Sequence, residues 1–191
     1  VLLVACVVTF TTAGEKAMSA AKVGQFAPQF ALQDQNGKTV NLNDFSGKIV
    51  VLEWFNDACP FVQGAYKEGG MNSTASKITD KGVVWLAINS TNAGHSEFKA
   101  PREMSDWVQA QGAAPAAMLL DSTSGTGRAY AAKTTPHMFV VDPAGKVVYA
   151  GAIDDKRSAN PADTKTAHNY VRAALTEATS GKPVTVASTT P

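Results

Sequence analysis

Hydrophobic and polar positions follow two different periods along this chain. Short runs rich in β-branched and other apolar residues are typical of buried strands, whereas apolar residues three or four positions apart are typical of helices. The first pattern predicts strands over residues 48–55, 83–89 and 117–120 and a hairpin over 138–150. The second predicts helices over residues 59–78, 101–111, 127–131 and 161–179. Strands separated by helices predict an α/β domain with a mainly parallel central sheet and helices on both faces.

The two ends of the chain have a different pattern. Residues 1–20 begin with an apolar stretch and continue with small residues, as in the hydrophobic region and cleavage zone of a secretory signal. Cys6 also fits a bacterial lipoprotein signal, but the sequence stays apolar after it, which favours simple export to the periplasm over lipid anchoring. The stretch is too short to span a bilayer as a helix. Residues 182–191 have no helical period and predict a flexible tail after a domain of residues 21–181.

The composition agrees with one globular domain. The 191 residues are 45% hydrophobic and 17% charged, which is enough to bury a single core. The formal net charge is +1, and the chain has no run of basic residues. Nucleic acids and anionic membrane surfaces are therefore not expected partners.

The clearest candidate for chemistry is Cys59. An apolar run ends at the polar residues Asn56 and Asp57, and Cys59 follows with Pro60 directly after it. Proline is favoured at the first position of a helix, which makes Cys59 the residue that caps this helix. Unpaired backbone N–H groups and the positive end of the helix dipole stabilise a thiolate there. The alternative is an inert core thiol, which the helix-start position makes the weaker interpretation.

A second motif, Thr135-Pro136-His137, stands immediately before the predicted hairpin. A proline at the mouth of a strand cannot donate a hydrogen bond to the sheet. It therefore belongs at an edge or in a special turn, such as one with a cis peptide bond.

Together these motifs resemble the thioredoxin-like superfamily, and within it the AhpC/TSA (redoxin, peroxiredoxin-like) family. The sequence from Gly24 to Lys48 fits the entry pattern of the same family, so the resemblance covers residues 23–180. It implies a thioredoxin-like fold, with a central mixed β-sheet flanked by helices. It also implies an exported thiol oxidoreductase, with antioxidant or thiol–disulfide exchange activity, that acts through Cys59.

The resemblance assigns roles to several further residues. Glu53 falls where thioredoxins carry a buried carboxylate beneath the sulfur, and desolvation would raise its pKa and suit it as a proton acceptor. The alternative is a Glu53 that faces solvent or pairs with a lysine such as Lys48 or Lys146. Thr135 and Pro136 would form a cis step that faces the sulfur and the substrate, rather than a merely structural turn.

Four residues are expected to line the active-site cleft or to act in it. Trp54, Asn56 and Pro60 belong to its wall. His137 could assist proton transfer to the thiolate, and the alternative is a surface histidine beside a strand.

Departures from the family pattern change the expected chemistry. Val62 stands where thioredoxins have a second cysteine, so a local disulfide cannot form. Asn56 and Leu52 replace the Thr or Ser and the Pro that hold the peroxide in peroxidatic relatives, although Asn56 could still donate a hydrogen bond. Arg128 resembles in type the arginine that polarises the peroxide in those relatives, but its spacing does not establish the match.

Two functional classes are left. In the first, Cys59 reacts with a peroxide or a protein disulfide, without a cofactor or metal, and an external thiol reductant, a thioredoxin-like reductase or a cysteine beyond Pro191 regenerates it. In the second, the domain is a non-enzymatic module in which Cys59 and His137 bind a metal such as copper, or which binds a partner protein. Soft copper sites favour paired sulfur ligands, so the single available cysteine favours the first class.

Overall fold

The computed structural model describes residues 20–67, 71, 74, 82–112, 115–160, 162–163 and 166–191. Apart from Ala20, the expected signal region, including Cys6, lies outside these residues. Across the part of the chain that is described, no helix is long and apolar enough to cross a membrane.

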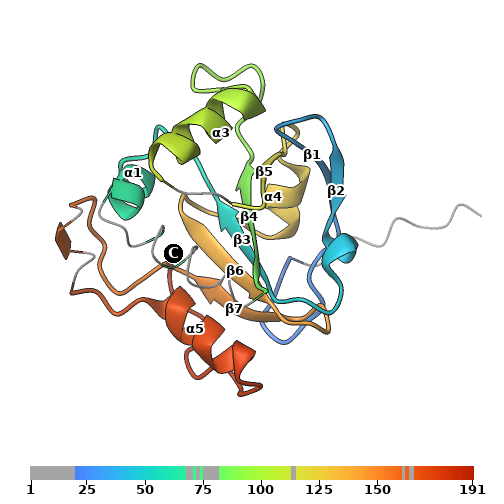
Figure 1. The fold of residues 1–191 in the computed structure, drawn as a ribbon, viewed down its shortest axis with the longest axis vertical. Coiled ribbons are helices and arrows are strands. Elements are labelled where there is room, and N and C mark those ends of the chain that lie inside the picture. Colours follow the sequence, from blue (N-terminus) through green and yellow to red (C-terminus); the bar gives the residue numbers. More distant parts are fainter. Residues whose placement is uncertain are drawn as a thin grey trace, which may run out of the picture.

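Seven strands of the described residues form one mixed sheet in the order β2-β1-β5-β4-β3-β6-β7 (Figure 1). The strands are β1 (Ala31–Asp34), β2 (Thr39–Asn41), β3 (Val50–Trp54), β4 (Val84–Asn89), β5 (Ala117–Leu120), β6 (His137–Val141) and β7 (Val147–Gly151). β4 is parallel to both β3 and β5, whereas the other four pairings in the sheet are antiparallel. The mixed sheet confirms the predicted fold class. The prediction of a mainly parallel sheet is wrong, because hairpins form both edges.

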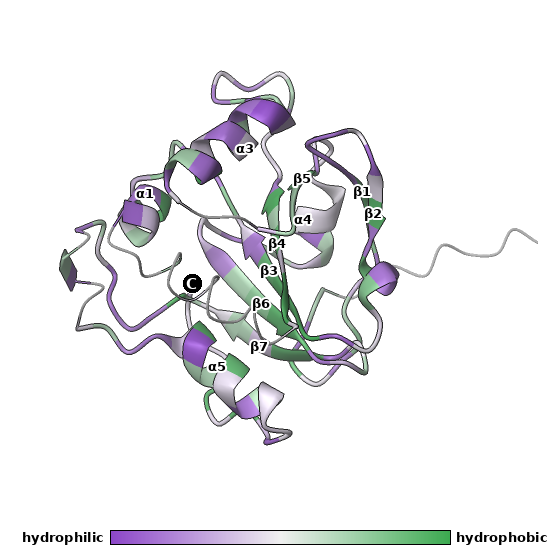
Figure 2. Ribbon diagram, viewed as in Figure 1, coloured by the Kyte–Doolittle hydropathy of each residue, from purple (hydrophilic) through white to green (hydrophobic). Residues whose placement is uncertain are grey.

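Helices cover both faces of this sheet, as predicted. α1 (Pro60–Lys67), α3 (Pro101–Ala110) and α5 (Tyr170–Thr179) pack on one face, over buried side chains that we call the first core (Figure 1). α4 (Gly125–Ala129), the 3-10 helix η1 (Leu42–Phe45) and the N-terminal segment lie on the opposite face, over the second core. Figure 2 shows hydrophobic residues concentrated in the central strands and hydrophilic positions on the helices around them.

β3 contributes side chains to both cores. All of its residues are buried, which accounts for an apolar run that is interrupted only by Glu53. Side chains alternate between the faces along a strand. Val51 accordingly packs in the first core, and Leu52 and Trp54 pack in the second. Glu53 faces the first core, where it is bonded to Tyr66 and Trp85.

Most predicted elements occur close to their predicted positions, but their ends differ. The last helix begins at Tyr170 rather than at residue 161, because Asn169 caps it by accepting a hydrogen bond from Arg172 N (2.7 Å). The helix predicted over residues 59–78 is confirmed as α1 up to Lys67, and most of the rest of that range lies outside the described residues. The hairpin of β1 and β2 was not predicted, since such short strands carry little pattern.

The prediction of a flexible tail over residues 182–191, here called the C-terminal segment, is wrong. The segment runs beside β7: Ala150 N donates to Ala187 O, and Thr189 N donates to Ala150 O, each at 3.1 Å. The Thr189 hydroxyl also accepts a hydrogen bond from Ala152 N (2.9 Å). A side chain at Gly151 would overlap Thr189, so the glycine permits this close approach. Pairing between distant backbone segments leaves no period in a short polar sequence, which is why the sequence did not reveal it.

Candidate active site

Cys59 stands at the start of α1, as predicted. The turn before it is closed by two hydrogen bonds: Ala58 N donates to the Asn56 side-chain oxygen (2.9 Å), and Cys59 N donates to Asn56 O (3.1 Å). The helix then begins at Pro60, and Gln63 N donates to Cys59 O (3.0 Å). Cys59 is partly buried. The turn therefore holds the sulfur at the N-terminal end of α1, where the backbone N–H groups of the first turn are not used by the helix.

The Thr135-Pro136 step is the partner of this sulfur. Its peptide bond is cis, and Cys59 Sγ donates a hydrogen bond to Thr135 O (3.0 Å). The two motifs that the sequence placed far apart thus meet at the end of the sheet, between β3 and β6. The protonated thiol makes this bond, and deprotonation would release the carbonyl for another donor.

Glu53 is fully buried on the same side of the sheet as Cys59. Its Oε2 accepts hydrogen bonds from the Tyr66 hydroxyl (2.8 Å) and from Trp85 Nε1 (2.9 Å), whereas its Oε1 has no partner in the described residues. Burial raises the pKa of Glu53 to about 7, although the two hydrogen bonds act in the opposite direction. The alternative of a solvent-facing or lysine-paired Glu53 is wrong, because no part of the residue is exposed and its polar partners are neutral.

Asp57 is a second buried carboxylate beside the cysteine, and the sequence predicted no chemical role for it. It is 2% exposed, and its Oδ2 forms an ion pair with Lys99 Nζ. Its Oδ1 has no partner in the described residues. Lys99 lies far away in the sequence, in a segment without any motif, so no local signal could have identified this pair.

Trp54 does not line the cleft, contrary to the prediction. It is 3% exposed and packs in the second core, with its ring centroid 5.0 Å from that of Tyr130 and 5.3 Å from that of Phe139. Its indole N–H donates to Ser90 Oγ (3.1 Å). The aromatic side chain on the Cys59 side of the sheet is the next residue, Phe55, because adjacent positions point to opposite faces.

His137 also lies on the side of the sheet away from Cys59. It pairs with Trp54 across β3 and β6, and its ring stacks on Phe139 at a centroid distance of 4.5 Å. Its Nδ1 accepts a hydrogen bond from Lys133 N (3.4 Å). Burial and the charge of Lys133 lower the pKa of His137 to about 4, so the ring is neutral near pH 7. The predicted role of His137 in proton transfer to the thiolate is therefore wrong, and so is the alternative of a surface histidine.

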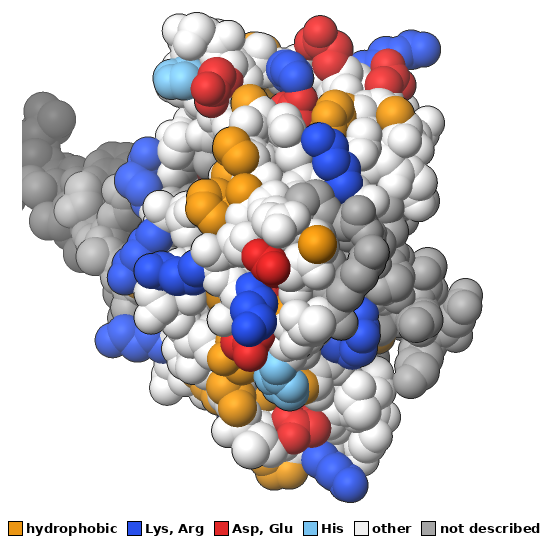
Figure 3. Space-filling model, turned by 90° about the vertical axis from the view of Figure 1, so that its left-hand side faces the viewer, with side chains coloured by type: hydrophobic (Ala, Val, Ile, Leu, Met, Phe, Trp, Pro, Cys, Tyr) orange, Lys and Arg blue, Asp and Glu red, His pale blue; other side chains and the backbone are white. Residues whose placement is uncertain are grey.

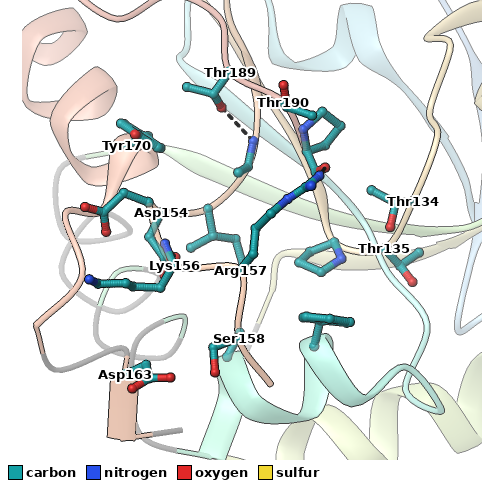
Figure 4. Close-up of a pocket in the computed structure, with 17 residues that line it drawn as sticks. Thr134, Thr135, Asp154, Lys156, Arg157, Ser158, Asp163, Tyr170, Thr189 and Thr190 are labelled. Carbon is teal, nitrogen blue, oxygen red and sulfur yellow. Dashed lines mark hydrogen bonds between the residues drawn. The ribbon is translucent and has the colours of Figure 1, made fainter. Parts of the chain in front are cut away.

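A groove of about 630 Å³ opens beside the cis step (Figure 4). Thr134, Thr135 and Pro136 form one side of it, and Phe61 and Ala65 of α1 form another. The loop of residues 152–158, together with Asp163, Tyr170 and residues 189–191, completes it. Of the other predicted wall residues, Pro60 is the first residue of α1, and Asn56 shapes the turn before Cys59.

No metal site accompanies the cysteine within the described residues. They contain no group of three His, Cys, Asp or Glu side chains that could hold a metal ion. The two side chains that the copper-binding alternative requires, Cys59 and His137, belong to opposite faces of the sheet.

Comparison with known proteins places the chain in a family. A model of the AhpC/TSA family matches residues 23–150, more than half of the chain. The thiol-disulfide oxidoreductase ResA of Bacillus subtilis is 28% identical over 132 residues, which are 65% of this chain and 64% of ResA. "Putative peroxiredoxin bcp" of Coxiella burnetii is 36% identical over 81 residues, which are 41% of this chain and 52% of that protein. The chain thus spans less than two thirds of the length of these two curated relatives.

Solved structures agree with this assignment. An uncharacterized conserved protein from Geobacillus kaustophilus superimposes with a TM-score of 0.74 at 30% identity, over 85% of each chain. The resemblance first noted in the Cys-Pro and Thr-Pro motifs is therefore confirmed over the length of the domain. This chain belongs to the AhpC/TSA family and has a thioredoxin-like fold.

Proposed function

We propose that this chain is a thiol oxidoreductase whose reacting atom is Cys59 Sγ. The observation that carries the proposal is the placement of this sulfur at the start of α1, in contact with the carbonyl that precedes the cis proline. The helix N-terminus stabilises the thiolate that attacks a substrate sulfur or oxygen. The sulfur contacts Thr135, which is one of the residues that line the groove.

Glu53 is proposed to exchange protons with the reacting thiol. With a pKa of about 7, it can both accept and return a proton near neutral pH. None of the hydrogen bonds in the described residues joins Glu53 to Cys59, so proton exchange between them would need a bridging water molecule. Asp57 and its ion pair with Lys99 hold the turn before the cysteine, where Gln63 Nε2 also donates to Asp57 O (2.9 Å).

Thiol–disulfide exchange is the better supported of the two reactions. Peroxide reduction needs donors that hold the peroxide oxygens, and Asn56 is the candidate donor from the turn. Its oxygen accepts from Ala58 N, and one of its two N–H groups donates to Glu97 Oε2 (3.4 Å), which leaves a single N–H for a peroxide oxygen. Arg128 belongs to α4, away from α1, and donates to Thr123 O. Peroxide reduction remains the second candidate, and the similarity to the bcp protein favours it.

The reductant is proposed to come from outside the domain. Val62, at the position of a second cysteine, is fully buried in the first core and offers no thiol. A sulfenic acid or mixed disulfide on Cys59 therefore needs an external thiol, from a small molecule, a thioredoxin-like reductase or a cysteine beyond Pro191. The metal-binding or partner-binding module is the weaker alternative, because His137 cannot join Cys59 as a ligand.

Export to the periplasm belongs to the same proposal. It rests on the signal-like sequence of residues 1–20, with simple export favoured over lipidation at Cys6. Mass spectrometry of the mature protein from a periplasmic fraction would test both points.

The decisive test of the function follows the fate of the sulfur. The full chain carrying Cys6→Ser would be reduced and then exposed either to a small disulfide or to hydrogen peroxide with a sulfenic-acid probe. We expect a mixed disulfide or a probe adduct on Cys59, formed faster than on a short unstructured cysteine peptide. Cys59→Ser in the same background serves as the control and should give neither product. Labelling no faster than that of the peptide would refute the proposal.

A further inference from the structure

Specific contacts hold the walls of the groove near Cys59 in place. The loop after β7 is brought against α1 at Gly64, where a Cβ would lie only 2.5 Å from Ala159 O. The C-terminal segment is held on the other side by Gly151, which leaves room for Thr189. Arg157 crosses between these parts and donates to Pro191 O (3.0 Å) (Figure 4). Four separate parts of the chain therefore meet around one cavity.

Charged side chains of both signs line this cavity. Lys156, Asp154, Asp155 and Asp163 all contribute to it. Arg157 adds a second positive charge to the lining. Lys156 interacts electrostatically with Asp154, although the ion pairs of the described residues include none between Lys156 and a carboxylate. Figure 3 shows acidic and basic side chains side by side in the middle of the face that carries α1 and α5. A ligand with ionised groups of both signs would complement this lining.

The charges and the sulfur lie at different ends of the cavity. In Figure 4, Thr134 and Thr135 lie on one side, whereas Asp154, Lys156 and Asp163 lie on the other. Cys59 is not itself a lining residue, but its Sγ is 3.0 Å from Thr135 O, so the reacting atom adjoins the threonine end of the cavity. Phe61 and Pro136 supply apolar surface near that end. The volume of about 630 Å³ is within the range of about 300–1,000 Å³ that small-molecule sites occupy.

From this arrangement we propose that the groove binds a small peptide-like thiol that carries carboxylate and ammonium groups, and that this thiol regenerates Cys59. This inference rests on the proposed function and names the class of its reductant. The ligand places its sulfur beside Thr135 and its ionised groups against Lys156 and the aspartates. A short thiol without ionised groups, such as 2-mercaptoethanol, would lack the contacts with Lys156 and the aspartates.

The chemistry balances without any other reactant. When Cys59 is part of a mixed disulfide, the ligand's thiolate attacks the sulfur that is bonded to Cys59 Sγ, a new disulfide forms, and Cys59 leaves as a thiolate that takes up the ligand's proton. When Cys59 is a sulfenic acid, one ligand thiol forms a mixed disulfide with it and releases water. A second ligand thiol then frees Cys59 and leaves as the oxidised dimer of the ligand.

The test uses a label that does not depend on the physiological substrate. The full chain with Cys6→Ser would be converted to the thionitrobenzoate mixed disulfide at Cys59, and the release of the coloured thiolate would be followed against thiol concentration. The coloured thiolate leaves when the thiol attacks Cys59 Sγ, which is the same attack that displaces water from the sulfenic acid. The probes are glutathione, its diethyl ester, 2-mercaptoethanol and reduced thioredoxin. Lys156→Glu tests the groove, and Lys48→Glu is the matched control, because Lys48 is exposed and precedes β3, at the end of that strand away from Cys59.

We expect release by glutathione to saturate, with a half-saturating concentration that rises about fivefold in Lys156→Glu and does not change in Lys48→Glu. Rates with the diethyl ester and with 2-mercaptoethanol should increase linearly and be the same in all three proteins. Linear kinetics with glutathione, or equal effects of the two lysine variants, would overturn the inference. Faster release by thioredoxin, unaffected by Lys156→Glu, would also overturn it and indicate a protein reductant. Failure of Cys59 to take the label at all would instead contradict the proposed function.

Discussion

Replacing Glu53 by glutamine removes its titrating proton but can keep its two hydrogen bonds. Both donors, the Tyr66 hydroxyl and Trp85 Nε1, are bonded to the same oxygen, Oε2, and the side-chain carbonyl of glutamine can accept both. The other oxygen, Oε1, makes no hydrogen bond in the described residues, so the amide nitrogen that replaces it breaks none. The new N–H groups are buried without an acceptor, and the resulting loss of stability does not depend on pH. A difference between Glu53→Gln and the parent protein that depends on pH therefore reports on the carboxylate.

The sign and size of this difference follow from the pKa of Glu53. Its folded value of about 7 lies above the ordinary value of 4.5, so the folded protein holds a proton that the unfolded chain has released. The stability from Glu53 is fully present below pH 4.5 and is lost as the pH rises to about 7. The two values correspond to a loss of roughly 3 kcal/mol in the free energy of unfolding.

His137 has the opposite effect in nearly the same range of pH. Its pKa falls from 6.5 to about 4, so its contribution is present above pH 6.5 and is lost as the pH falls to about 4. In the parent protein the two contributions oppose each other between pH 4.5 and 6.5, and the stability should change little. In Glu53→Gln the His137 contribution remains alone, and the stability should rise with pH.

Urea unfolding of both proteins at half-unit steps from pH 4 to pH 8 measures the effect. We expect the free energy of unfolding of Glu53→Gln, relative to the parent, to increase by roughly 3 kcal/mol between pH 4.5 and pH 7. Glu103→Gln, at the exposed start of α3, is the matched control and should show no comparable trend. A difference that stays constant across this range would show that Glu53 titrates at its ordinary value, and the proposed role in proton exchange would fall with it.

Three further predictions test the site and its surroundings. Lys99→Met leaves the buried Asp57 carboxylate without its cation and should lower the free energy of unfolding by about 1–3 kcal/mol in urea titrations, whereas an unchanged value would mean that the ion pair is irrelevant to folding. Gly151→Ala should push the C-terminal segment away from β7 and lower the free energy of unfolding by about 1–3 kcal/mol. Amide exchange over residues 187–189 should become faster, and unchanged exchange would contradict the close approach. Trp54→Phe should leave the alkylation rate of the active-site thiol within about twofold of the parent, because the indole packs on the other face of the sheet. A larger change in this rate would indicate that Trp54 lines the cleft.

The parts of the fold that the sequence predicted are those with a strong local pattern. β3, β4 and β5 are mostly apolar runs. Pro60 correctly indicated where α1 begins. The β1–β2 hairpin escaped prediction because its strands are only four and three residues long. The pairing of the C-terminal segment escaped it because it joins backbone segments that are distant in the sequence. Neither leaves a period in a stretch of so few residues.

The site shows the same division between local and distant information. Cys59 and the cis step could be predicted, since proline marks both places in the sequence. Trp54 was assigned to the cleft because spacing along a strand does not say which face is which, and a shift of one residue reverses the assignment. The pairing of Asp57 with Lys99 needs the three-dimensional structure, because nothing near either residue in the sequence indicates the other.

The pairing of the C-terminal segment with β7 also has a consequence for how copies of the protein meet. A strand at the edge of a sheet exposes backbone groups that can pair with a strand of another molecule, and natural proteins cover or shorten such edges. Here the segment occupies the outer side of β7 through the hydrogen bonds at Ala150, while β2, at the opposite edge, is only three residues long. Both borders of the sheet are thus poor templates for a neighbour, and residues 187–189 help the domain to resist aggregation.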